Sequence, residues 1–175
     1  MRLNVGSGPD YREGWVNVDG CGLFKRDVAL LLPDESLADR FGKESADEIF
    51  MRDMMEHFFR WEGIEVLKDF YDVLKIGGKV TIITPDLEKI IECPFLTLKR
   101  KTELIRGAQG QSGVPREAPI VMQAWEEYPK LFSHPYTWTE DELKGVMAGL
   151  GFTWTCTAWQ EGYSMVVSAT KQEKP

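Results

Sequence analysis

Short apolar runs bounded by glycine, proline and polar residues recur along the first half of the chain, and they predict β-strands. Five segments have this character: residues 2–5, 15–19, 26–32, 47–51 and 79–84. Pro33 stops the third segment, since proline cannot donate to a strand ladder. The fifth segment is almost continuously apolar, as is typical of a parallel strand that is buried on both faces.

A helical period takes over between the last two of these segments. Within residues 61–75, apolar side chains recur on one helical face: Trp61, Ile64, Leu67, Phe70, Tyr71 and Leu74. This stripe predicts an amphipathic helix that packs on the core. Gly77-Gly78 is expected to end the helix in the left-handed conformation, with Lys75 in its last turn.

Polar residues mark the beginnings of two further helices. Asp86 either caps a helix that begins at Leu87 or positions a substrate. The tetrapeptide Thr139-Glu140-Asp141-Glu142 forms a capping box for a helix that continues through Leu150, and Gly151 is expected to stop it.

Two segments near the C-terminus, residues 152–159 and 163–170, alternate between apolar and polar side chains. They flank the turn Glu161-Gly162 and therefore predict an antiparallel hairpin. Together with the alternating strands and helices before it, this hairpin indicates an α/β domain whose parallel sheet is closed by an antiparallel pair.

Residues 92–137 depart from this regular pattern. The segment contains spaced prolines and glycines, among them the turn Gly107-Ala108-Gln109-Gly110, together with several aromatic residues. A long insert in a compact domain is usually functional or disordered, and its aromatic residues favour function. We therefore expect one domain, residues 1–175, in which residues 92–137 form a lid and an acceptor-binding region.

The composition fits one folded domain. The 175 residues, 43% of them hydrophobic, suffice for one core and are too few for two ordinary domains. A net charge of −7 makes a general nucleic-acid surface unlikely, because contacts with phosphates require clustered Lys and Arg. The basic cluster Lys99-Arg100-Lys101 is expected to be a solvated helix face.

Cysteine spacing and hydropathy bear on metal content and compartment. Cys21, Cys93 and Cys156 are widely separated and form no C-x-x-C pair, so they offer no zinc framework and fit a reducing compartment. No metal site is expected. The first strand begins at once, which leaves no room for a signal peptide, and no apolar run approaches the roughly 18 residues of a membrane span. We expect a cytoplasmic protein that does not bind membranes.

The turn between the first two strands has the composition of a nucleotide-binding edge. Gly6 and Gly8 let the backbone approach a bulky ligand, and Asp19 at the end of the second strand can bind a ribose diol. A dinucleotide is disfavoured because Tyr11 stands where the NAD fingerprint has its third glycine. The chain between Gly8 and Trp15 is also too short for a crossover helix, so an abbreviated loop is expected there.

Five blocks, in order, resemble the class I S-adenosylmethionine (SAM)-dependent methyltransferases: residues 3–8, 14–19, 47–49 with 54–58, 73–79 and 84–87. The likeness is strongest to the small methyltransferase type 11 branch that lacks the first helix. This resemblance implies a Rossmann-like α/β fold, with a mostly parallel seven-stranded sheet, helices on both faces and a C-terminal antiparallel hairpin. It also implies SAM as the cofactor and S-adenosylhomocysteine (SAH) as the product.

The resemblance places the cofactor beside the first two strands. The turn Gly6-Ser7-Gly8 would contact the methionine end of SAM through its backbone, and Asp19 would bind the ribose hydroxyls. Asn4 and Gly20 flank these positions and belong to the same expected cofactor site.

In the family, an acid near the end of the third strand accepts a hydrogen bond from the adenine amino group. Leucines occupy the usual positions in this chain, so Asp34 is the nearest candidate, with Asp39 behind it. Asp34 is alternatively the N-cap of the helix that follows.

Residues after the fourth strand are expected to line the same pocket, since ligands of doubly wound sheets gather where the strand order reverses. Arg52, Asp53 and Met54 would then lie under the methionine part of SAM. Asp53 would hold the methionine ammonium group or act as a base. His57 borders the site as a cofactor contact, a catalytic group or a structural tie to backbone groups, paired with Glu56 in the structural alternative.

His134 is the residue expected to take the proton, because related sequences also place a histidine before this helix. It can alternatively close a hydrogen-bond network. The sequence thus predicts a methyltransferase with Asp53 and His134 as catalytic residues and a small-molecule acceptor, such as a sugar or another metabolite. A SAM-binding module without turnover and an NAD-dependent oxidoreductase are the alternatives, and the oligomeric state is left open.

Overall fold

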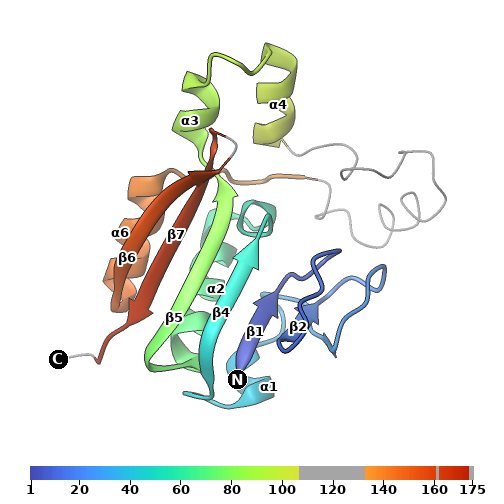
Figure 1. Ribbon diagram of the computed structural model, residues 1–175, viewed down its shortest axis with the longest axis vertical. Helices are drawn as coiled ribbons and strands as arrows, with labels where there is room; N and C mark the ends of the chain where they lie inside the picture. Colours follow the sequence, from blue (N-terminus) through green and yellow to red (C-terminus); the bar gives the residue numbers. More distant parts are fainter. Residues whose placement is uncertain (107–132, 161, 174–175) are drawn as a thin grey trace.

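The computed structural model describes residues 1–106, 133–160 and 162–173 (Figure 1). Much of the expected insert, residues 107–132, lies outside this part of the chain, and with it the turn Gly107-Ala108-Gln109-Gly110. Glu161 of the hairpin turn and the side chain of Cys156 also lie outside it. The expectation of a lid is therefore not tested.

The described residues form a seven-stranded sheet in the order β3-β2-β1-β4-β5-β7-β6 (Figure 1). Its strands are β1 (Arg2–Val5), β2 (Val16–Asp19), β3 (Val28–Ala29), β4 (Ala46–Arg52), β5 (Leu74–Pro85), β6 (Phe152–Gln160) and β7 (Ser164–Lys171). Strands β1 to β5 pair in parallel, and β7 runs antiparallel to both β5 and β6. The mostly parallel sheet and the C-terminal hairpin are confirmed.

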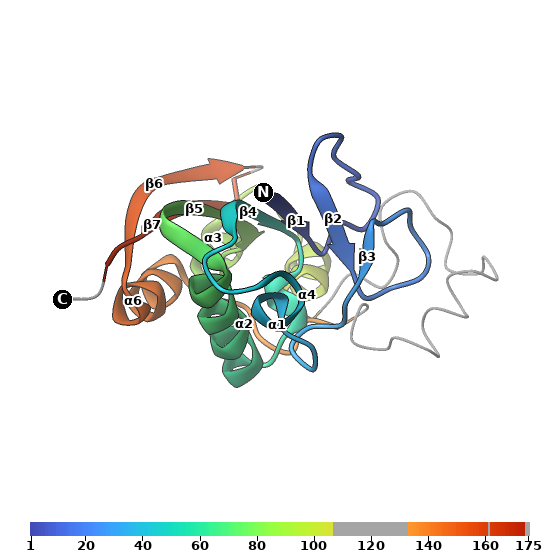
Figure 2. The ribbon, with the colours of Figure 1, turned by 90° about the horizontal axis from the view of Figure 1, so that it is seen from below.

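Three helices lie on one side of this sheet: α1 (Leu37–Phe41), α2 (Arg60–Val73) and α6 (Glu140–Leu150) (Figure 2). Alternate strand residues pack into one core with them and are at most 1% exposed: Leu3, Val5, Ile49, Met51, Val80, Ile82, Met165, Val167 and Ala169. Beyond the carboxyl ends of the parallel strands stand α3 (Leu87–Glu92) and α4 (Leu98–Arg106) (Figure 1). A short 3-10 helix, η1 (Met55–His57), follows β4.

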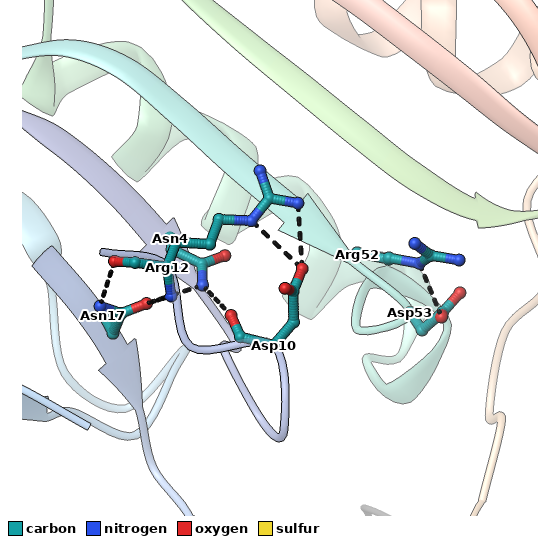
Figure 3. A network of polar contacts seen from close by, with 6 residues as sticks. All are labelled: Asn4, Asp10, Arg12, Asn17, Arg52 and Asp53. Atoms are coloured by element: carbon teal, nitrogen blue, oxygen red, sulfur yellow. Dashed lines mark hydrogen bonds and ion pairs between the residues drawn. The ribbon is translucent and has the colours of Figure 1, made fainter. Parts of the chain in front are cut away.

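The opposite face of the sheet carries no helix among the described elements, although helices on both faces were expected. The chain passes from β1 to β2 through a loop, as the spacing predicted, and two buried asparagines hold this loop. Asn4 donates to the carbonyl oxygen of Asp10 (2.6 Å) and to the side-chain oxygen of Asn17 (2.9 Å), which also accepts from the backbone N–H of Arg12 (Figure 3). The Arg12 guanidinium lies 3.4 Å from the ring centre of Phe50 on β4, so the loop covers this part of the face.

Two element boundaries differ from the sequence prediction. Helix α2 ends at Val73, because Leu74 is already extended and pairs with Ala46 of β4. Gly77, with φ 78°, lies within β5 and is not a helix stop.

Strand β3 is shorter than the predicted run at residues 26–32. The Asp27 carboxylate is bound to the Asn17 amides and to the Tyr11 hydroxyl, which fixes the chain before the strand. Leu30 and Leu32 then turn into the core. Only Val28–Ala29 remains to pair with β2.

Asp86 joins the two helices at the carboxyl end of the sheet. It is 1% exposed, and one of its carboxylate oxygens accepts from the backbone N–H of Lys89 (2.8 Å) in α3. The other oxygen accepts from the backbone N–H of Glu140 (2.7 Å) at the start of α6. Thr139 caps α6 and Gly151 ends it in the left-handed conformation, as the capping box predicted. Asp86 is thus a double helix cap.

Replacing Asp86 with alanine leaves two backbone N–H groups without their acceptor. We expect the free energy of unfolding to fall by about 2–3 kcal/mol, measured by urea denaturation. Thr139→Ala is the matched control, because it removes a single cap and should cost about 1 kcal/mol. Equal losses in the two variants would contradict the double-cap role.

Candidate functional site

The strand order reverses between β1 and β4. Open α/β sheets bind ligands at the carboxyl ends of the strands at such a switch point. This edge gathers the turn Gly6-Ser7-Gly8 after β1, Asp19 at the end of β2, and Arg52 and Asp53 after β4. Figure 3 shows Arg52 and Asp53 at the end of β4, to one side of the loop that joins β1 and β2. Sequence reasoning placed these residues at one edge, and the structure does so.

Asp19 ties the turns after β1 and β2 together. The residue is 8% exposed, and its carboxylate oxygens accept from the backbone N–H of Gly8 (2.7 Å) and of Cys21 (2.7 Å). The N–H groups of Gly6 and Ser7 donate to the carbonyl oxygen of Val18 (2.9 and 3.1 Å). Each Asp19 oxygen can accept a further hydrogen bond, because a carboxylate has about four acceptor positions.

The two glycines of the turn serve different purposes. At Gly6, with φ +66°, an added Cβ would lie 2.0 Å from the sulfur of Met54, so Met54 occupies the space that we expected a ligand to use. At Gly8, with φ +45°, an added Cβ would meet nothing within 4 Å. The Ser7 hydroxyl is buried and has no hydrogen-bond partner among the described residues. An unpaired buried hydroxyl beside open space fits a polar ligand at this turn.

Three of the expected cofactor contacts lie differently from the sequence interpretation. Asn4 is 2% exposed and donates both amide hydrogens within the protein, so its side chain holds the loop. Gly20 packs against Leu31, whose Cα would lie 3.1 Å from an added Cβ. Asp34 is exposed in the turn before α1, and the N-cap of that helix is Ser36, so the capping interpretation of Asp34 is wrong.

Asp53 adopts an unusual backbone conformation at the edge. Its φ is 48°, in the left-handed region that residues with a Cβ rarely occupy, and its N–H donates to the carbonyl oxygen of Ile83 (2.9 Å). Its side chain, 58% exposed, lies 3.4 Å from the Arg52 Nε (Figure 3). Such conformations cluster at functional sites, where the surrounding structure maintains them.

A second polar group lies behind this edge, around η1. Glu56 is 2% exposed, and its carboxyl group accepts from the Thr84 hydroxyl on β5 (3.0 Å). Burial and, to a lesser extent, the negative charge of Asp53 raise the pKa of Glu56 to about 8.

Both histidines of the chain meet beside Glu56. The rings of His57 and His134 stand edge to face, with their centres 4.9 Å apart. Nδ1 of His57 lies 2.9 Å from the carbonyl oxygen of Ser133, and Nδ1 of His134 lies 2.7 Å from that of Leu104. A carbonyl oxygen only accepts, so each Nδ1 carries a proton, and in the neutral ring of His134 the lone pair lies on Nε2.

These contacts agree with the structural-tie interpretation of His57, which joins η1 to the segment before α6. Burial, and then the nearby His57, lower the pKa of His134 to about 4, so its ring is neutral near pH 7. The pairing of His57 with His134 escaped the sequence interpretation, because the two residues are far apart in the chain. The one available signal was that the chain contains only two histidines.

No protein-family model and no curated protein matches the sequence. Solved structures do match it. Protein PH0226 of Pyrococcus horikoshii superposes with a TM-score of 0.62 at 19% identity, over 98% of this chain and 81% of the other. A SAM-dependent methyltransferase of Thermotoga maritima, described as a possible histamine N-methyltransferase, gives 0.57 at 17% identity over 98% and 82%. A SAM-dependent methyltransferase of Mesorhizobium loti gives 0.57 at 12% identity over 98% and 90%.

The chain has the fold of the class I SAM-dependent methyltransferases. In this methyltransferase fold, a loop joins β1 to β2 in place of a crossover helix, as the sequence spacing predicted. No helix occurs between residues 5 and 16. None of the described helices is both long and apolar enough to cross a bilayer.

The raised pKa of Glu56 makes the stability of this methyltransferase fold depend on pH. The folded state binds the Glu56 proton more tightly than the unfolded state does. The resulting contribution to the free energy of unfolding is complete below pH 4.5 and is lost as the pH rises through about 8. His134 acts in the opposite sense, because its lowered pKa makes its contribution fall away as the pH drops from 6.5 towards 4. Between pH 6.5 and about 8 only the loss from Glu56 remains.

We therefore expect the free energy of unfolding to fall by roughly 2 kcal/mol as the pH rises from 6.5 to about 8. A chelator in the buffer keeps metal ions away from the Glu56 carboxyl group during this measurement. Urea denaturation at each pH checks this expectation. Glu56→Gln should abolish most of the fall, whereas the exposed control Glu88→Gln should retain it. A fall of the same size in Glu56→Gln would show that another group is responsible.

Proposed function

We propose that the chain is a SAM-dependent methyltransferase. The observation that carries this proposal is the buried Asp19 carboxylate, bound to the Gly8 and Cys21 amides at the point where the strand order reverses. It lies at the ligand-binding edge of a sheet that has the methyltransferase topology.

The residues around this edge fit the parts of the cofactor. Asp19 would accept from the ribose hydroxyls with the acceptor positions that its amide contacts leave. The Ser7 hydroxyl and the open position at Gly8 suit the polar methionine end. Asp53 can pair with the methionine ammonium group, and Arg52 with the carboxylate. SAM, when bound, supplies a methyl group that is already activated by its positive sulfur.

The chain's own contribution is therefore alignment and proton handling. Holding an acceptor in line with a reactive group can supply about 7–11 kcal/mol of a barrier. The neutral ring of His134 presents an Nε2 lone pair that can accept a proton from the acceptor. Its low pKa makes it a weak base by itself, since a base works best when its pKa lies near the working pH.

A small molecule is the proposed acceptor. The net charge of −7 opposes a nucleic-acid surface, and the exposed groups at the edge are the Arg52–Asp53 pair and not a basic patch. The name of the Thermotoga maritima neighbour, a possible histamine N-methyltransferase, also refers to a small acceptor. A cytoplasmic location is proposed because the three cysteines are widely spaced and form no C-x-x-C pair, which fits a reducing compartment.

Binding of SAH tests the cofactor directly. At about one hundred times its dissociation constant, SAH should stabilise the protein by about 2.7 kcal/mol, measured as a shift in thermal unfolding, whereas NAD should not. Asp19→Asn should weaken SAH binding by about 1.5–3 kcal/mol, because a charge-assisted hydrogen bond to the ribose is lost.

Glu65→Gln is the control, since this exposed residue lies on α2 and should leave SAH affinity unchanged. His134→Gln should slow methyl transfer while keeping SAH affinity. Stabilisation by NAD in place of SAH would favour the oxidoreductase alternative and refute the proposal.

A further inference from the structure

We propose that Glu56, His57 and His134 bind one divalent transition-metal ion, of which Zn²⁺ is the best fit, and that this ion binds the methyl acceptor. The part of the proposal that concerns the acceptor rests on the proposed function, whereas the metal site does not. The cysteines of the chain show no zinc-binding pattern, and this site uses none of them.

The geometry of the three side chains suits a shared ligand. One ligand atom from each of Glu56, His57 and His134 lies within 4.8 Å of the others. Ligand atoms bound to one Zn²⁺ at about 2.0–2.2 Å can be at most about 4.4 Å apart, so a small movement of the side chains closes the site. Glu56 and His57 both lie in η1, which leaves His134 as the one ligand from a distant segment.

The surroundings of the histidines are those of metal ligands. A ligating imidazole usually donates its second N–H to a backbone carbonyl or a carboxylate, which fixes the ring and its tautomer. Nδ1 of His57 meets the Ser133 carbonyl and Nδ1 of His134 meets the Leu104 carbonyl. An imidazole that donates from Nδ1 in this way would bind a metal through Nε2.

A metal ion would supply the counter-charge that Glu56 needs when it is ionised. Glu56 is buried, and within residues 1–106, 133–160 and 162–173 no Lys or Arg forms an ion pair with it. Among the described residues, the side chain that donates to Glu56 is the Thr84 hydroxyl. An ionised carboxylate buried at this position would be costly without a counter-charge, and a bound divalent ion would supply that charge.

The ligand chemistry narrows the choice of ion. Mg²⁺ and Ca²⁺ prefer oxygen ligands throughout, whereas two imidazoles and one carboxylate form a common set for catalytic Zn²⁺ and other first-row ions. Three protein ligands leave a coordination position open. A hydroxyl acceptor bound there would lose its proton more readily, because the metal lowers its pKa.

The reaction then balances without a strong base. The acceptor O–H bond breaks and its proton passes to water, leaving the electron pair on the oxygen. That oxygen forms the new bond to the methyl carbon while the carbon–sulfur bond breaks towards sulfur. With the ion bound, the lone pairs of His57 and His134 are used in coordination, so both histidines position the metal. The lowered pKa of the metal-bound acceptor then replaces the base role proposed above for His134.

A cobalt titration tests the site. Co²⁺ added to chelator-treated full-length protein should give visible d–d absorption that saturates at one equivalent, without thiolate charge-transfer bands, and Zn²⁺ should displace it. Glu56→Gln, His57→Ala and His134→Ala should each weaken Co²⁺ binding at least tenfold, since even the loss of an outer contact costs about 10–100-fold. Glu88→Gln, on the exposed surface of α3, should bind as the wild type does.

A second measurement keeps the test valid if a variant does not fold. The wild-type chain has only two histidines, so its NMR spectrum has two sets of imidazole signals. One equivalent of Zn²⁺ should shift both sets together. Absence of cobalt absorption, thiolate bands, unchanged binding in the folded variants, or unmoved imidazole signals would overturn the metal site.

Calorimetric titration of SAH into the same samples separates the two proposals. SAH binding by a protein that binds no Co²⁺ would refute the metal site alone. Co²⁺ binding by a protein that binds no SAH would refute the proposed function and leave the metal site in place.

Discussion

The hydrogen bonds of the Asp19 carboxylate are the interaction on which the ligand-binding edge depends. They join the backbone of Gly8, after β1, to that of Cys21, after β2. Charge-assisted hydrogen bonds of this kind are short and strong, and burial increases the cost of breaking them. The carboxylate thus fixes the relative position of two turns that would both contact SAM under the proposed function.

The loop between β1 and β2 imposes a second constraint. Asn4 and Asn17 occupy strand positions whose side chains point to the face without described helices, and their amides satisfy backbone groups of the loop. Arg12 then covers Phe50 on the same face. Because polar side chains replace the apolar contacts of a crossover helix, the small sheet can keep its register with a shorter connection.

The sequence predicted the sheet well because strand and helix periods are local properties. The hairpin, the capping box at Thr139 and the strands β1, β2 and β4 follow from residues close together in the chain. The end of α2 was mispredicted because pairing of Leu74 with Ala46 overrides the preference of Gly77 to stop a helix.

Polar contacts between distant segments limited prediction of the site. Nothing local indicates that the carbonyl groups of Ser133 and Leu104 would fix the two imidazoles, or that the rings of His57 and His134 would meet. The carboxyl edge, in contrast, follows from topology, since parallel strands present their carboxyl ends at one edge wherever their order reverses. The edge was therefore predictable, and the cluster behind it required coordinates.

The most direct measurement is a map of backbone amide chemical shifts during titration of SAH into isotopically labelled protein. The account predicts that the largest changes fall on Ser7, Gly8 and Cys21, next to the Asp19 carboxylate, while amides of α1 remain unchanged. Changes that are absent from these turns, or that centre on another part of the fold, would contradict it.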